Sequence, residues 1–159
     1  MISTQAEAPG LVFVHMAGSH YAFRHHYPPE TAKFAFDFVD EQTAKVSEDV
    51  RRNINEYDNT IRYTDGVLHA IVEELRQIDR PAFLIYLSDH GETPSSKFMR
   101  DAKDKDLWDL PLVMWFSKQY CKEYPEIVSA MRSVTEDHTQ TDALMPLLLK
   151  TCLVDTAGL

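Results

Sequence analysis

The sequence of 159 residues lacks any hydrophobic run long enough to cross a membrane. A membrane-spanning helix needs about 20 consecutive apolar residues, and none of the apolar stretches approaches that length. The N-terminus also lacks the apolar core of a secretory signal peptide. We therefore expect the chain by itself to be soluble.

Positive charge is scarce and scattered. The 16 Lys and Arg residues stand against 25 Asp and Glu, which gives a formal net charge of -9. The longest basic cluster is Arg51-Arg52, whereas nucleic-acid backbones and anionic membranes attract several clustered Lys and Arg residues. The composition argues against nucleic-acid binding and against a polybasic membrane patch.

Cysteine is also rare, and no internal repeat or low-complexity tract occurs. The two cysteines, Cys121 and Cys152, match no common zinc-binding spacing. We interpret both as buried or half-buried helix residues. With 44% hydrophobic residues, the chain is long enough for one domain with a sizeable core.

The most informative segment is an apolar run that ends in polar residues. Six of the seven residues 82–88 are apolar or aromatic, which is typical of a strand buried on both faces. Asp89, His90 and Gly91 follow, and glycine permits a turn in which the two side chains converge. Such a carboxylate and imidazole suit zinc, with manganese as the second choice. Glu92 either orients His90 or begins the next loop in solvent.

An alternative interpretation of this motif involves no metal. Asp89 could cap a following helix, and His90 could be a loop histidine with ordinary contacts within the fold. Short motifs often occur by chance, so this motif alone favours the interpretation without a metal.

A second apolar run, residues 11–14, is likewise followed by residues that include histidine. It leads into His15, a turn of small residues and then His20. Open α/β sheets build their sites at the carboxyl ends of their strands. We therefore expect a strand over residues 11–16 and a site to which both histidine-bearing loops contribute.

The periodicity of apolar residues predicts alternating strands and helices. We expect further strands over residues 82–88 and 112–116, and helices over 46–75, 125–134 and 141–153. The long first helix could be interrupted near residues 57–59. This order of elements predicts an α/β fold with a parallel or mixed sheet and helices on its faces.

Four ordered motifs give the chain a resemblance to a known family. They are His15-Met16-Ala17-Gly18-Ser19-His20 with the nearby Arg24 and Tyr27-Pro28, then residues 54–65, 86–92 and 110–117. Together they resemble the phosphoethanolamine transferases of the sulfatase and alkaline-phosphatase superfamily. The resemblance implies a three-layer sandwich with a mostly parallel sheet, alkaline-phosphatase-like, of which residues 1–159 form a single, incomplete domain.

The resemblance also implies roles for individual residues. Asp89 and His90 fall where the family holds its catalytic zinc. His20 falls where the family contacts the transferred phosphate group or a second metal, which would make it a catalytic residue. His15 and Ser19 belong to the same motif and are expected to bind the substrate.

In this family a threonine attacks the phosphorus of a phosphatidylethanolamine donor, and an acceptor on lipid A or a glycan then takes the group. The resemblance therefore implies modification of lipopolysaccharide by an inner-membrane protein with a periplasmic catalytic domain. Because the periplasm is oxidising, a disulfide between Cys121 and Cys152 stays an open alternative.

The chain departs from the family in two ways. The family's nucleophilic threonine and a glutamate zinc ligand precede the matching region, so we expect a fragment, a truncated product or a subunit that needs the N-terminal half or a complementing chain. We expect the chain alone to be inactive. Residues 93–110 contain no histidine, although the family holds one there, and Asp106 or Asp109 occupies that region.

Two alternatives to a transferase stay open. The chain could be a catalytically silent sulfatase-like α/β fragment or partner-binding module. It could also be a relative that acts as a sulfatase or phosphodiesterase.

Overall fold

The computed structural model describes residues 10–94, 105–136 and 140–154. These residues form two compact units, each described by itself below. Unit 1 contains the described residues of 1–74 and 87–111, and unit 2 contains those of 75–86 and 112–159. The single domain expected over residues 1–159 stays a prediction.

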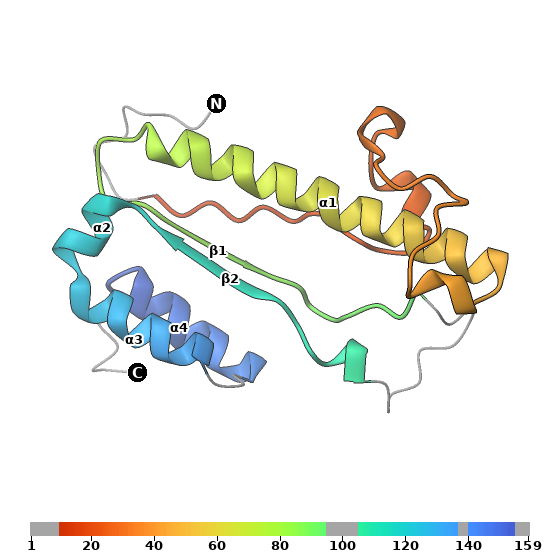
Figure 1. The fold of residues 1–159 in the computed structure, drawn as a ribbon. Coiled ribbons are helices and arrows are strands. Elements are labelled where there is room, and N and C mark those ends of the chain that lie inside the picture. Colours follow the sequence, from red (N-terminus) through yellow and green to blue (C-terminus); the bar gives the residue numbers. More distant parts are fainter. Residues whose placement is uncertain (1–9, 95–104, 137–139, 155–159) are drawn as a thin grey trace. The chain divides into compact units, whose positions relative to one another are not determined.

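Unit 1 is built along one long helix, α1 (Glu48–Arg76), all but the last two residues of which belong to this unit (Figure 1). Ser47 precedes the helix, and its Oγ accepts a hydrogen bond from the Val50 amide at 3.4 Å. This contact and the acidic residues of the first turn stabilise the helix N-terminus. The helix runs without a break through residues 57–59, so the interruption considered from the sequence does not occur.

The buried residues of α1 are polar. The buried residues are Asn55, Asn59, Thr60 and Thr64, while Ile61 is 46% exposed. A buried amide has to keep its hydrogen bonds, and both asparagines bond to the backbone of a preceding loop. Among the described residues, no helix combines the length and the apolar character needed to cross a bilayer.

The strand predicted over residues 11–16 is wrong. In the described part of the chain these residues pair with no other strand. Leu11, Val12, Phe13 and Val14 are between 51% and 78% exposed. The run has the composition of a strand, but a strand also requires neighbours that share its backbone hydrogen bonds and cover its side chains.

Unit 2 contains β2 (Leu112–Phe116) and all but the last residue of β1 (Phe83–Leu87). The two strands pair with each other and run antiparallel (Figure 1). Beside them, the Ser117 amide donates to the Ala82 carbonyl at 2.9 Å. The helices and strands bear out the α/β class, but a parallel sheet is not confirmed. An apolar run fits either direction of pairing, so the sequence pattern could not decide between them.

A short helix that the sequence pattern did not predict, α2 (Lys118–Glu123), follows β2. Ser117 is its N-cap, because Ser117 Oγ accepts a hydrogen bond from the Tyr120 amide at 3.1 Å. The same oxygen accepts from the Ala82 amide at 3.0 Å. The Ser117 hydroxyl therefore caps the N-terminus of α2 and connects it to Ala82, the residue before β1. In the sequence, a serine directly after an apolar strand was the signal that could have predicted this helix.

Two further helices, α3 (Pro125–Glu136) and α4 (Leu144–Thr151), confirm the helices expected in these regions. They lie on one face of the sheet in unit 2 (Figure 1). The buried core residues are Tyr120, Ile127, Val128, Met131 and Leu147. The described part of unit 2 has one helical layer on its sheet, so the three-layer arrangement stays a prediction.

Cys121 and Cys152 are free, half-buried thiols, and burial raises the pKa of the Cys152 thiol.

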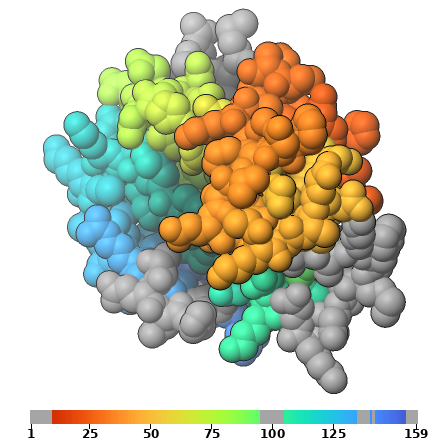
Figure 2. Space-filling view, turned by 45° about the vertical axis from the view of Figure 1, so that its right-hand side comes forward, coloured from red at the N-terminus to blue at the C-terminus, as the bar shows by residue number. Residues whose placement is uncertain are grey.

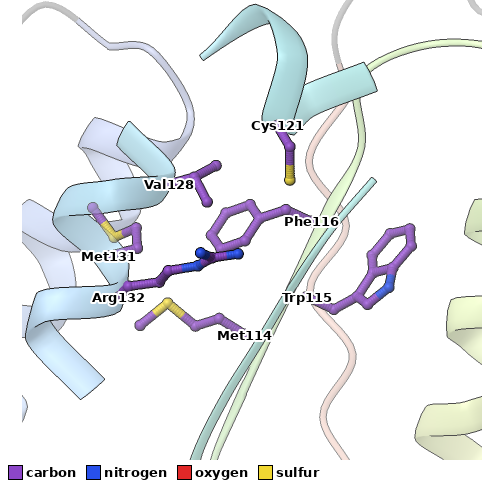
Figure 3. A pocket seen from close by; sticks show the side chains of 7 residues that line it. All are labelled: Met114, Trp115, Phe116, Cys121, Val128, Met131 and Arg132. Carbon is purple, nitrogen blue, oxygen red and sulfur yellow. The ribbon is translucent and has the colours of Figure 1, made fainter. Parts of the chain in front are cut away.

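A pocket of about 230 Å³ opens beside this core. In Figure 3, Met114 and Phe116 point from β2 toward α3, beside the Arg132 guanidinium, whereas Trp115 points to the other side of the strand, as strand alternation requires. The lining residues are Met114, Trp115, Phe116, Cys121, Val128, Met131 and Arg132. None of the candidate site residues lines this pocket.

Tyr120 makes the stability of unit 2 depend on pH. Its ring is 3% exposed, and its hydroxyl donates to the Thr151 carbonyl at 2.6 Å. Burial, with a smaller contribution from Cys152, raises the pKa of Tyr120 to about 12. Because the folded-state pKa lies above the ordinary value of 10.0, the stabilisation is fully present below that value and is lost as the pH rises through about 12.

We expect the melting temperature to fall less steeply with alkaline pH in the Tyr120→Phe variant than in the wild-type chain. Thermal denaturation followed by circular dichroism, from about pH 8 to pH 12, measures this difference. Tyr63→Phe is the matched control, because Tyr63 is an exposed tyrosine on α1. If the melting temperatures of the wild-type chain and the Tyr120→Phe variant fell equally at alkaline pH, the prediction would be contradicted.

Candidate metal centre

The candidate metal centre lies in the loop that follows β1, within unit 1. Ser88 Oγ donates to the His90 carbonyl, and the His90 amide donates to Asp89 Oδ1 at 3.0 Å. The Gly91 amide donates to the Leu107 carbonyl at 3.0 Å. These bonds turn the chain directly after the strand, so Asp89 and His90 leave the alternating pattern that would send them to opposite faces.

The same loop is tied to α1 by a side chain that carried no sequence signal. Asn53 Nδ2 donates to the Pro94 carbonyl at 3.2 Å. Thr93, the residue before Pro94, is 6% exposed. An asparagine inside a helix gives no indication of which distant carbonyl it will reach, so only the structure could find this contact.

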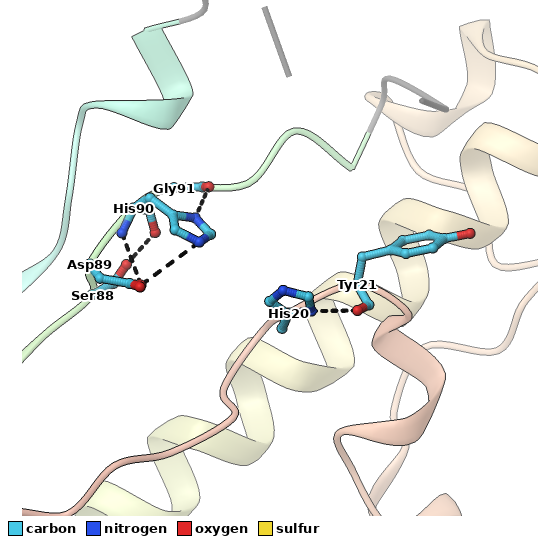
Figure 4. Close-up of polar contacts among 6 residues, drawn as sticks. All are labelled: His20, Tyr21, Ser88, Asp89, His90 and Gly91. Carbon is cyan, nitrogen blue, oxygen red and sulfur yellow. Dashed lines mark hydrogen bonds and ion pairs between the residues drawn. The ribbon is translucent and has the colours of Figure 1, made fainter. Parts of the chain in front are cut away.

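The atoms of Asp89 and His90 that are candidates for metal binding lie near each other (Figure 4). Asp89 Oδ1 is 3.9 Å from His90 Nε2. His90 Nδ1 is 2.8 Å from the Gly91 carbonyl; a carbonyl only accepts, so Nδ1 carries the proton and Nε2 carries the lone pair in the neutral ring. Zinc bonds to such atoms are about 2.0–2.2 Å long, so these two atoms could both serve as ligands of one zinc ion.

The centre is open to solvent but offers few ligands. The Asp89 side chain is 91% exposed and the His90 side chain is 36% exposed. Within the described residues, no group of three or more His, Cys, Asp or Glu side chains could hold a metal ion together. Catalytic zinc usually has three protein ligands. The fit to zinc is therefore partial, with two suitable donors and a need for at least one more.

The second histidine-bearing loop also lies in unit 1. The His20 amide donates to the Ala17 carbonyl at 3.4 Å and closes a turn. Gly18 has φ +53° in this turn, a left-handed conformation that glycine adopts without strain. His15 is exposed and Ser19 is half-buried.

The described contacts do not join His20 to the Asp89–His90 pair. Figure 4 shows them on separate segments, each bonded to its own neighbours. His20 is exposed, and its Nδ1 donates to the Tyr21 carbonyl. Its ring lies edge to face with the ring of His26, with centroids 6.3 Å apart. Glu92 is half-buried. The roles of these residues stay predictions.

A family model described as Sulfatase matches residues 1–150. The chain belongs to the sulfatase family. The matched residues include both histidine-bearing loops and the candidate metal centre.

Three relatives confirm the resemblance to phosphoethanolamine transferases. The chain is 28% identical over 122 residues to the phosphoethanolamine transferase EptC of Escherichia coli O18:K1:H7, covering 72% of this chain and 21% of that protein. It is 27% identical over 134 residues to the phosphoethanolamine transferase EptA of Helicobacter pylori, covering 80% and 25%. It is 24% identical over 115 residues to the Kdo(2)-lipid A phosphoethanolamine 7''-transferase of Escherichia coli K12, covering 69% and 20%.

The chain thus spans between 20% and 25% of the length of these three relatives. No solved structure matches it.

Proposed function

We propose that this chain is the metal-binding part of a zinc-dependent transferase that moves phosphoethanolamine from a phospholipid to lipid A or another glycan. Membership of the sulfatase family and the transferase relatives support the reaction class. The observation that carries the proposal is the 3.9 Å separation of Asp89 Oδ1 and His90 Nε2. The same proposal puts the whole protein at the inner membrane, with its catalytic domain in the periplasm.

Asp89 and His90 have the chemistry to hold zinc in this proposal. The Gly91 carbonyl keeps the proton of His90 on Nδ1 and so directs the lone pair at Nε2 to the metal. Glu92 is assigned to orient His90. When bound, zinc lowers the pKa of a nucleophilic hydroxyl and stabilises charge on phosphoryl oxygens. The N-terminal half or a complementing chain would contribute the nucleophile and a further ligand.

The loop that contains His20 is assigned to the phosphate group. The His20 ring donates through Nδ1 to the Tyr21 carbonyl, so Nε2 can accept a proton or, once protonated, donate to a phosphoryl oxygen. His15 and Ser19, from the same loop, are assigned to the substrate. This assignment requires His20 and the metal centre to be brought together in the whole protein.

A catalytically silent sulfatase-like module that binds a partner is the second candidate. Two observations favour it: the described residues offer only two metal donors at the centre, and residues 93–110 contain no histidine. A sulfatase or phosphodiesterase is compatible with the family match, but the relatives named above are transferases.

Zinc titration tests the metal centre directly. We expect the isolated chain to bind zinc weakly, and Asp89→Ala and His90→Ala each to weaken that binding at least about ten-fold, because each removes one of two donors. Isothermal titration calorimetry measures the affinity. His69→Ala is the matched control, because His69 is an exposed histidine on α1, and its zinc affinity should be unchanged.

The decisive experiment uses the whole protein. Transfer from phosphatidylethanolamine to lipid A is followed by mass spectrometry, and Asp89→Ala or His90→Ala should lower the rate at least about 100-fold. Whole protein that contains no zinc by metal analysis, or that transfers the group equally well with both variants, would overturn the proposal. Absence of transfer in the wild-type whole protein would favour the silent module.

A further inference from the structure

A loop of unit 1 presents large apolar side chains to solvent. Phe36, Phe38 and Val39 are 57%, 41% and 52% exposed. The half-buried Phe34 packs on Phe38 with ring centroids 5.4 Å apart. We call residues 33–39 the aromatic loop. In Figure 2 this part of the chain, in orange, lies at the surface. Large apolar side chains that gather on a surface indicate an interaction site.

A buried asparagine of α1 fixes the first half of the aromatic loop. Asn59 is 3% exposed. Its Oδ1 accepts hydrogen bonds from the amides of Lys33 and Phe34 at 2.8 and 3.0 Å. Its Nδ2 donates to the Phe34 carbonyl at 2.8 Å. The side-chain amide thus bonds to the loop backbone as a neighbouring strand would.

A second buried asparagine, one helical turn earlier, fixes the other half. Asn55 is 1% exposed. Its Nδ2 lies 2.9, 3.3 and 2.9 Å from the carbonyl oxygens of Ala35, Phe36 and Phe38. Because these contacts already order the backbone, binding through the exposed rings would not have to order it again.

The end of the aromatic loop is anchored by a compact turn. Asp40 Oδ1 accepts hydrogen bonds from the Gln42 amide, the Thr43 amide and the Thr43 hydroxyl at 3.0, 2.8 and 2.8 Å. These hydrogen bonds, chiefly those from Thr43, hold the pKa of Asp40 below its usual value. The exposed rings therefore sit on a backbone that is held at both ends and in the middle.

The aromatic loop has charges of both signs at its rim. The Lys33 ammonium lies 5.9 Å from the Phe34 ring centroid, and the Arg52 guanidinium carbon lies 5.5 Å from the Phe36 centroid. Asp37 is exposed within the loop. Cations beside aromatic rings suit lipid phosphates above an apolar layer, and a carboxylate suits an ammonium group. Together with a net charge of -9, this pattern complements zwitterionic headgroups better than anionic ones.

We propose that the aromatic loop docks on the surface of a zwitterionic phospholipid bilayer. The exposed rings of Phe36 and Phe38 enter the headgroup region, and Lys33 and Arg52 contact lipid phosphates. The choice of a lipid rather than a protein partner rests on the proposed function, in which a phospholipid is the donor. The loop would then keep the catalytic domain close to the membrane that contains this donor.

Vesicle cosedimentation tests the docking. The 159-residue chain is mixed with vesicles of phosphatidylethanolamine and phosphatidylcholine, and the bound fraction gives the partition coefficient. Phe36→Ser/Phe38→Ser should lower that coefficient at least about ten-fold, because the apolar area that enters the membrane is lost. Leu11→Ser/Phe13→Ser is the matched control from another exposed apolar segment of unit 1 and should change it less than about two-fold.

A second variant tests the headgroup contacts without removing apolar side chains. Lys33→Glu/Arg52→Glu should lower the partition coefficient about three-fold or more, because each cation near a lipid phosphate contributes to binding. Circular dichroism establishes that each variant is folded. Absence of binding by the wild-type chain, equal losses in the Phe36/Phe38 and Leu11/Phe13 variants, or tighter binding to phosphatidylglycerol vesicles would overturn the proposal.

The vesicle assay contains no zinc and no acceptor, so its outcome is independent of turnover. If the wild-type whole protein transferred no phosphoethanolamine but the 159-residue chain still bound vesicles through Phe36 and Phe38, the proposed function would be refuted and the docking surface would stand. If the wild-type whole protein transferred phosphoethanolamine but the Phe36→Ser/Phe38→Ser variant bound vesicles as well as the wild-type chain, only the docking surface would be refuted.

Discussion

The Gly91→Ala variant is expected to lose most of its zinc affinity and about 3 kcal/mol of unfolding free energy. A Cβ at position 91 collides with the Asp106 carbonyl oxygen and lies 2.8 Å from the Asp106 carbonyl carbon and 3.1 Å from Leu107 Cα. These are backbone atoms, so no side-chain rotation relieves the collision. Either the loop that contains Asp89 and His90 or the turn at residues 105–107 has to move.

A matched control for this variant is Gly66→Ala. Gly66 lies within α1, and a Cβ there meets nothing within 4 Å. Alanine inside a helix is more favourable than glycine by about 0.5–1 kcal/mol, so this substitution should stabilise the chain. Urea denaturation and zinc titration of both variants test the pair. A Gly91→Ala protein with wild-type stability and affinity would show that the loop is not packed as described.

The Asn55→Ala variant is expected to lower the free energy of unfolding by about 2 kcal/mol or more and to loosen the aromatic loop. The substitution removes the amide that bonds the carbonyls of Ala35, Phe36 and Phe38 and leaves a gap at a position that is 1% exposed. Urea denaturation measures the loss of stability. Faster hydrogen exchange at residues 33–38 measures the loosening.

Asn53→Ala is the control on the same helix. Asn53 is half-buried and donates a hydrogen bond to one carbonyl, that of Pro94. The Asn53→Ala substitution should therefore lower the free energy of unfolding by about 1 kcal/mol or less. If Asn53→Ala and Asn55→Ala destabilised the chain equally, the buried amide of Asn55 would not have the role assigned to it.

Local patterns predicted most of the elements but not their pairing. Helices α1, α3 and α4 and strands β1 and β2 lie where apolar periodicity and the residues that typically end helices and strands predicted them. The run at residues 11–16 carries an equally strong strand pattern, yet no strand forms there in the described part of the chain. The difference is a partner, because β1 and β2 complete each other's hydrogen bonds and residues 11–16 have no described neighbour that does so.

The candidate metal centre was predictable only in part. The adjacent Asp89 and His90 after an apolar run were visible in the sequence, as was the glycine that follows them. The turn in which they converge is held by the hydrogen bond from the Gly91 amide to the Leu107 carbonyl, and the Gly91 carbonyl fixes which ring nitrogen of His90 carries the lone pair. The contacts of Asn53, Asn55 and Asn59 gave no sequence signal, because an amide side chain has no preference for a particular distant carbonyl.

The sequence by itself determined the α/β class, the sulfatase resemblance and the places of α1, α3, α4, β1 and β2, because these depend on residue types and on spacing within short segments. The tertiary structure alone decided the antiparallel pairing of β1 with β2, the 3.9 Å approach of Asp89 Oδ1 to His90 Nε2 and the rigid display of the aromatic loop. The physical reason is that hydrogen bonds between groups far apart in the chain, from the backbone or from side chains, form only when the folded chain brings their donors and acceptors together.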